Sequence, residues 1–101
     1  MEIIWTEHSR ADLQCFLDNI HEGTDKSANN YILNLIDYVT TLKDNPYMGK
    51  SYPKPILVDM MQLIYRKHKI LYTIYDNKIL ILAVVHNSRD MDKFFKSFLI
   101  Q

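Results

Sequence analysis

The segment "KILYTIYDNKILILAVVH", residues 69–86, decides the fold because it contains two strands and the turn between them. β-branched and aromatic residues dominate both halves of the segment, and these residue types favour strands. Asp76 and Asn77 separate the halves, and both tolerate the left-handed conformation that a two-residue hairpin turn requires. The segment therefore predicts a hairpin of two strands, over residues 69–75 and 78–85.

The second strand of this hairpin is apolar on both of its faces. Strict alternation places one set of residues on one face (Ile79, Ile81, Ala83, Val85) and a second set on the other (Leu80, Leu82, Val84). A strand with this pattern is central in its sheet and is covered on both sides. We therefore expect helices, or a partner protein, against each face of the sheet.

Two amphipathic helices are predicted before the hairpin. Apolar residues recur at helical spacing over residues 7–22, with Thr6 as the N-cap, and in a narrow seam over about residues 25–44. The short link between them predicts an antiparallel helical pair. The segment "NPYMGKSYPKP", residues 45–55, then ends the second helix, because Pro46 cannot continue it.

Two strands and one helix complete the predicted order. "EIIW", residues 2–5, predicts a first strand, and residues 61–65 predict a strand that joins the hairpin through a turn over "RKH", residues 66–68. After the hairpin, Ser88 is the expected cap of a last helix. The order β-α-α-β-β-β-α predicts a single α+β domain over residues 1–101. Its antiparallel sheet is packed with the N-terminal helical pair and a short C-terminal helix, and the first strand lies at an edge or pairs back.

Composition excludes several classes of protein. The chain of 101 residues is 48% hydrophobic and 24% charged, as is usual for a globular domain. No run of about 18 apolar residues occurs, so we expect no membrane span. Cys15 is the single cysteine and no signal-peptide pattern opens the chain, which indicates a reducing, cytoplasmic setting. The spacing of histidines and cysteine predicts no metal site, and with two glycines no phosphate-binding loop or cofactor is expected.

The charges are unevenly divided along the chain, although the net charge is zero. Residues 1–45 carry three basic and eight acidic side chains, whereas residues 46–101 carry nine basic and four acidic ones. This asymmetry indicates an interaction surface, and two solvated acidic helices would produce it equally well. A dedicated RNA-binding domain usually has a basic excess, which this chain lacks.

The order of these features resembles the RelE/ParE superfamily of toxins from bacterial toxin–antitoxin modules. A first strand ending in tryptophan precedes a helical pair, an "NPxxG" break, a tyrosine-rich hairpin and a final "RD". The matching positions extend over almost the whole chain (Trp5, Ala11, Leu13, Pro46, Gly49, Ile70, Leu71, Tyr72, Tyr75, His86, Arg89, Asp90).

The resemblance implies one of two activities. One branch cleaves mRNA on the ribosome with basic residues and an acid–base set, and the ParE-like branch blocks DNA gyrase without an accepted catalytic residue. In both branches a small antitoxin wraps the toxin and covers its functional surface. The expected partners are therefore a cognate antitoxin, and either DNA gyrase or the ribosome with its mRNA, with no membrane involved.

Two departures from the family pattern favour the ParE-like branch. Met61 stands where many relatives carry an arginine, with Arg66 as a possible substitute in the turn. Phe94 stands where nuclease members place a tyrosine, and phenylalanine has no hydroxyl to exchange a proton. The ribosome-dependent nuclease and a non-toxic, complex-forming relative remain alternatives.

His86 and Arg89 are the candidate catalytic residues. A histidine titrates near neutrality and can act as acid or base, and an arginine can hold a phosphate or an acidic partner residue. Each also has a structural interpretation. His86 would form hydrogen bonds at the strand end, and Arg89 would pair with Asp90 or Asp92.

A basic run is the predicted contact surface for the target protein or nucleic acid. It consists of the residues at the first hairpin turn, with one lysine from the proline-bearing loop (Arg66, Lys67, His68, Lys69, Lys50). The alternative interpretation is a solvated hairpin tip.

Overall fold

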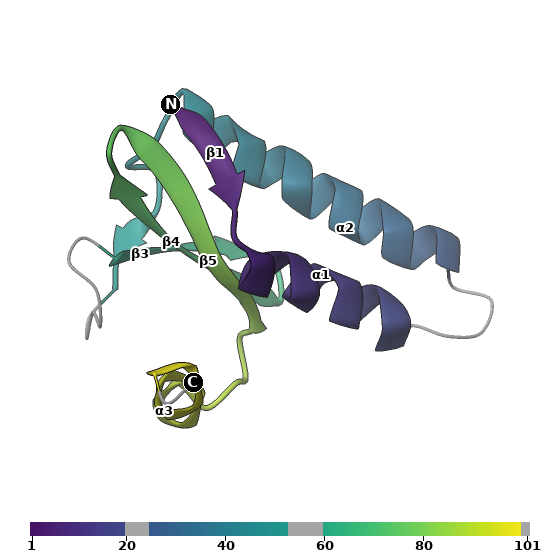
Figure 1. The fold of residues 1–101 in the computed structure, drawn as a ribbon. Coiled ribbons are helices and arrows are strands. Elements are labelled where there is room, and N and C mark those ends of the chain that lie inside the picture. The colour runs from purple at the N-terminus through teal and green to yellow at the C-terminus, as the bar shows by residue number, and fades with distance from the viewer. Residues whose placement is uncertain (20–24, 53–59, 100–101) are drawn as a thin grey trace.

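A computed structural model describes residues 1–19, 25–52 and 60–99, which form a five-stranded sheet with helices against both faces (Figure 1). The elements follow in the order β1 (Glu2–Trp5), α1 (Glu7–Asn19), α2 (Asp25–Thr40), the 3-10 helix η1 (Thr41–Lys43), β2 (Lys50–Ser51), β3 (Met60–Tyr65), β4 (His68–Tyr75), β5 (Lys78–His86) and α3 (Met91–Leu99). The predicted α+β order is confirmed, with β2 as an additional short strand. The predicted end of the first helix, residues 20–22, lies outside the described residues.

The strands lie in the order β1-β5-β4-β3-β2, so β5 is an inner strand as its apolar faces predict. The pairs β2–β3, β3–β4 and β4–β5 are antiparallel. Strand β1 lies at an edge and pairs parallel with β5, from Glu2 opposite Lys78 to Trp5 opposite Ile81. The sheet is therefore mixed, and the antiparallel prediction holds for four of its five strands.

Two tight turns join β3, β4 and β5. Asp76 and Asn77 have φ angles of 52° and 60°, so the predicted left-handed turn between β4 and β5 is confirmed. The turn before β4 contains Arg66, at φ 52°, and Lys67. His68, predicted to belong to this turn, is instead the first residue of β4 and pairs with Tyr65.

Strand β5 contains one more residue than the stretch of β4 that it faces. Tyr72 lies opposite Ile81 and Leu71 lies opposite Ala83, so Leu82 is an extra residue in β5. This is a β-bulge, which reverses the alternation of side chains beyond it.

The bulge divides β5 between two cores. Before it, Ile79 and Ile81 belong to the cluster that also contains Val84. Ala83 and Val85 belong to the second cluster. The prediction that Ala83 and Val85 share a face with Ile79 is therefore wrong, because the extra residue exchanges the two faces.

Each core lies between the sheet and different helices. We call the side covered by α1 and α2 the first face, where Leu35, Val39 and Leu42 are fully buried against the sheet. The second face is covered by α3, whose Phe94 packs with buried residues of three strands (Met60, Leu71, Ala83, Val85). Figure 1 shows α1 and α2 side by side, and α3 follows the loop after β5.

Candidate functional site

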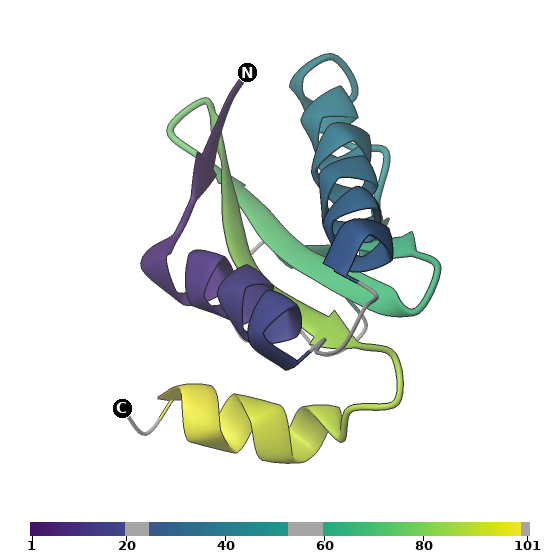
Figure 2. The same cartoon turned by 90° about the vertical axis from the view of Figure 1, so that its right-hand side faces the viewer.

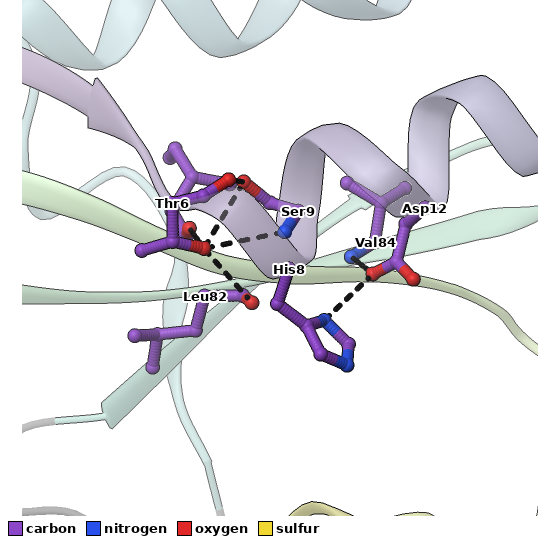
Figure 3. A network of polar contacts seen from close by, with 7 residues as sticks. Thr6, His8, Ser9, Asp12, Leu82 and Val84 are labelled. Carbon is purple, nitrogen blue, oxygen red and sulfur yellow. Dashed lines mark hydrogen bonds and ion pairs between the residues drawn. The ribbon is translucent and has the colours of Figure 1, made fainter.

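Helix α1 takes the place of β1 beside the second half of β5. Its N-cap, Thr6, donates its backbone N–H to the Ile81 carbonyl at 3.2 Å, and its Oγ1 donates to the same oxygen at 2.7 Å. The Ser9 N–H donates to Thr6 Oγ1 at 3.2 Å, which confirms the predicted cap (Figure 3). The hydroxyl of Thr6 therefore joins the start of α1 to the strand.

A carboxylate continues this connection three residues along β5. Asp12 Oδ2 accepts a hydrogen bond from the Val84 N–H at 2.9 Å, and His8 Nδ1 lies 3.3 Å from the same oxygen (Figure 3). Burial raises the pKa of the Asp12 carboxyl, while the Val84 N–H and His8 act in the opposite direction. The side chains of Thr6 and Asp12 thus form hydrogen bonds with the backbone groups of Ile81 and Val84, near the strand end that leads to His86.

His86 is exposed at the end of β5, and its ring is oriented by Ser88. Nδ1 accepts the Ser88 N–H at 3.1 Å and lies 2.7 Å from Ser88 Oγ. Because Nδ1 accepts this N–H, the proton of the neutral ring is assigned to Nε2. His86 therefore forms hydrogen bonds at the strand end through Nδ1, and Nε2 remains available as a donor.

The prediction that Ser88 caps the last helix is wrong. Asp90 Oδ1 accepts the N–H groups of Asp92 at 3.0 Å and Lys93 at 3.2 Å, so Asp90 is the N-cap of α3. The side chain of Ser88 contacts His86 instead. The cap therefore lies two residues later in the chain than predicted.

The loop after β5 is attached to the β3–β4 turn. Asn87 donates its backbone N–H to the Lys67 carbonyl at 2.8 Å and its side-chain amide to the Arg66 carbonyl at 2.8 Å. These two bonds bring the first two residues of the predicted basic run next to His86.

His68 lies on the first face, between the helical pair and His86. Its ring centroid is 4.6 Å from that of Phe16 and 5.4 Å from those of Tyr31 and His86. Its Nδ1 lies 2.8 Å from the Tyr31 hydroxyl. Burial lowers the pKa of His68, and the positive charges of His86 and Lys67 lower it further.

Arg89 lies toward α3, away from the His68 contact. Its guanidinium carbon is 5.2 Å from the ring centroid of Phe94, and its charge lowers the pKa of Asp12. Within the described residues it forms no ion pair with Asp90 or Asp92, so the pairing considered from the sequence is replaced by a cation–π contact.

The remaining members of the basic run do not join this cluster. Lys69 pairs with Val85 of the second core and therefore lies on the opposite face from His68. Lys50 is on β2, where it pairs with Gln62 of β3 at the far edge of the sheet from β5. The structure thus brings together Arg66, Lys67, His68 and His86, which we call the histidine end of the sheet.

Two residues of this end were missed from the sequence. Tyr31 is not in the predicted seam of α2, yet it lies four residues before Leu35, a spacing that would have placed it on the buried side. Asn87 has no local pattern that marks it, because its partners are the carbonyls of a distant turn.

The two positions at which the chain departs from the family pattern are buried. Met61 and Phe94 are 8% and 5% exposed, one in each core. Arg66, the considered substitute for an arginine at 61, lies in the turn with its guanidinium carbon 5.7 Å from the Tyr65 ring centroid. Neither buried position supplies a group that can transfer a proton.

Comparison with known proteins decides the family. The sequence matches the family model of the ParE toxin of type II toxin–antitoxin system, parDE, over residues 3–91. The chain belongs to this ParE toxin family. The resemblance to the RelE/ParE superfamily is thereby confirmed. A search of curated proteins finds no match.

Solved structures agree with the ParE fold at low sequence identity. A chain of the chromosomal ParDE system from P. aeruginosa has a TM-score of 0.72 at 19% identity, covering 85% of this chain and 95% of that one. A chain of the RelBE2 toxin–antitoxin complex from Mycobacterium tuberculosis has a TM-score of 0.64 at 19% identity, covering 85% and 96%. A copper-bound mutant toxin from Helicobacter pylori has a TM-score of 0.56 at 12% identity, covering 87% and 96%.

The described part of the chain contains neither a candidate metal site nor a candidate membrane-spanning helix. No three histidine, cysteine, aspartate or glutamate side chains gather there in a way that could hold a metal ion. None of the helices in the same ranges is long and apolar enough to cross a membrane.

Proposed function

We propose that this ParE-family toxin arrests growth by binding DNA gyrase in the cytoplasm, and that a cognate antitoxin keeps it inactive. The family match over residues 3–91 carries this proposal. The burial of Met61 and Phe94 supports it, because the chain lacks a proton-transferring group at either position. Function then depends on a binding surface, for which the histidine end of the sheet is the candidate.

A surface groove that contains exposed apolar side chains supports the antitoxin part of the proposal. It has a volume of 370 Å³. It lies between three parts of the chain, which are the C-terminal half of α2, strand β3 and the loop that precedes β2. Three exposed apolar side chains line it (Tyr38, Met48, Ile64). Exposed apolar clusters of this kind mark protein–protein contacts, so we assign the groove to the antitoxin.

Induction in cells that lack the neighbouring gene tests the toxin proposal. We expect filamentation and a DNA-damage response while translation initially continues. The purified protein should inhibit supercoiling by gyrase, and added antitoxin should restore it. The double variant R66A/K67A should lose inhibition, whereas K78A, which removes one positive charge at the other end of β5, should retain it. Normal growth on induction would contradict the toxin proposal as a whole.

A second candidate function rests on the contact between His68 and His86. Two imidazoles with centroids 5.4 Å apart, with the charge of Lys67 acting on His68, offer acid–base groups beside a cation. This favours a ribosome-dependent endoribonuclease as the alternative. In that case induction should cleave mRNA at codons and stop translation at once, and a folded His86→Ala variant should lose the cleavage. Full toxicity of H86A would exclude a catalytic role for His86.

A further inference from the structure

A continuous series of ring contacts crosses the boundary between the helical pair and the sheet. Tyr38 of α2 contacts Tyr65 of β3 with centroids 5.5 Å apart, and Tyr65 contacts Tyr31 at 5.5 Å. Tyr31 contacts His68 of β4 at 5.4 Å, and His68 contacts Phe16 of α1 at 4.6 Å. His68 is the one ring in this series whose charge changes near neutral pH.

We propose that His68 is a pH-sensitive joint, which attaches α1 and α2 to the sheet when it is uncharged and loosens them when it is protonated. Both helices reach this ring, α1 through Phe16 and α2 through Tyr31. Figure 2 shows the β3–β4 turn beside the N-terminal end of α2, where this attachment is made.

The hydrogen bond at Nδ1 fits the uncharged ring. With Nδ1 as the acceptor, the Tyr31 hydroxyl donates to it at 2.8 Å. A protonated Nδ1 is a donor, so the Tyr31 proton must turn toward another acceptor. The carbonyl of Tyr65 is the alternative, and it lies 3.4 Å away, at the long limit for a hydrogen bond.

The surroundings of His68 oppose a positive charge. Among the described residues, the titratable and charged groups that face it are the Tyr31 phenol from α2, the Lys67 cation from the turn and the His86 imidazole from β5, while α1 contributes the apolar ring of Phe16. Within the described ranges the single ion pair is His8 with Asp12, so no carboxylate there neutralises a charge on His68.

The direction of the pH effect follows from these surroundings. Burial and the neighbouring cations lower the pKa of His68 in the folded protein below its ordinary value. The unfolded chain therefore binds the proton more tightly than the folded one. The stabilisation is complete above about pH 6.5 and is lost as the pH falls from there toward the folded pKa.

Denaturant unfolding between pH 8 and pH 5 tests the joint, with H68F as the principal variant. Phenylalanine keeps an aromatic ring against Phe16 and Tyr31 but binds no proton. For the wild type we expect the unfolding equilibrium constant to rise by up to about tenfold per pH unit below about pH 6.5. H68F should lack this part of the rise. H8Q, which removes another partly buried histidine, should retain it.

Two measurements on the wild type locate the effect. Proton NMR should show His68 titrating below the ordinary imidazole range, and acidification should lower the amide-exchange protection factors of α2 more than those of β4 and β5. In H68F the protection factors of α2 should not respond. An equal acid response in H68F, or titration of His68 at or above its ordinary value, would overturn the proposal. If H68F does not fold, the titration of His68 decides alone.

Discussion

The carboxylate of Asp12 and the backbone N–H of Val84 lie 2.9 Å apart and join α1 to β5. Replacement of Asp12 by alanine leaves this N–H without its acceptor, and we expect a loss of about 1–3 kcal/mol in the free energy of unfolding. Asparagine keeps a side-chain oxygen at the same position, so D12N should be much milder. Denaturant titration of the three proteins at pH 7 checks this, and equal losses in D12A and D12N would contradict it.

The effect of Asp12 ionisation on stability can be measured by comparing the wild type with D12N at different pH values. Burial raises the pKa of this carboxyl in the folded state above its ordinary value of 3.8. The stability that the protonated acid contributes is therefore present below that value and is lost as the pH rises through the folded pKa. D12N cannot ionise, so the stability of the wild type relative to D12N should fall over this window. A constant difference between the two would show that the carboxyl is not perturbed.

The effects on stability of substitutions at Tyr72 and at Gly49 should depend on each other. The buried Tyr72 hydroxyl accepts the Gly49 N–H at 3.0 Å and donates to the Pro46 carbonyl at 2.9 Å, so Y72F should lose about 1–3 kcal/mol of stability. A methyl group at Gly49 would lie 2.6 Å from the same hydroxyl and 2.6 Å from the Gln62 carbonyl. We expect G49A to lose about 1–3 kcal/mol through overpacking.

The double variant Y72F/G49A separates these two causes. Because Y72F removes one of the three atoms that the new methyl group would meet, and leaves the ring carbon at 2.9 Å and the Gln62 carbonyl, the loss in the double variant should be smaller than the sum of the single losses. Full additivity, measured by denaturant unfolding, would show that the hydroxyl is not what restricts residue 49.

The start of α3 distinguishes the two candidate caps. D90A removes the acceptor of two helix N–H groups and should cost about 0.5–2 kcal/mol. S88A should change stability by less than about 0.5 kcal/mol, because Ser88 contacts the exposed His86 ring rather than the helix. Thermal unfolding of both variants ranks them, and a larger effect of S88A would restore the cap predicted from the sequence.

The elements of this fold could be predicted because their signals are local. The turn at Asp76 and Asn77, the cap at Thr6 and the proline at 46 each act through the nearest few residues. The parallel pairing of β1 could not be predicted in the same way. It joins residues at opposite ends of the chain, and the sequence of β1 is compatible with either direction.

The faces of β5 show a second limit of the sequence. A strand with polar residues on one side fixes its own register, because a shift would bury them. β5 is apolar on both sides, so nothing in residues 79–85 marks Leu82 as the extra residue. The bulge that turns Val84 and His86 toward the helical pair therefore has no signal in the sequence.

Only part of the candidate site could be predicted from the sequence. The basic turn and His86 are recognisable as chemical groups, and their neighbourhood follows from β4 and β5 being paired. Tyr31 meets His68 from 37 residues away in the chain, a contact that exists only after α2 has packed on the sheet. Lys50 carries the right charge but lies on another edge of the sheet, since charge alone does not set position.

The connection between α1 and β5 also bears on how these molecules behave at high concentration. β1 ends opposite Ile81, and a bare strand beyond that point would offer free N–H and C=O groups to a strand from another molecule. Thr6 and Asp12 bind the groups of Ile81 and Val84 that face that side. Helix α1 and its N-cap therefore prevent a strand of another molecule from pairing with this part of β5, and so oppose aggregation.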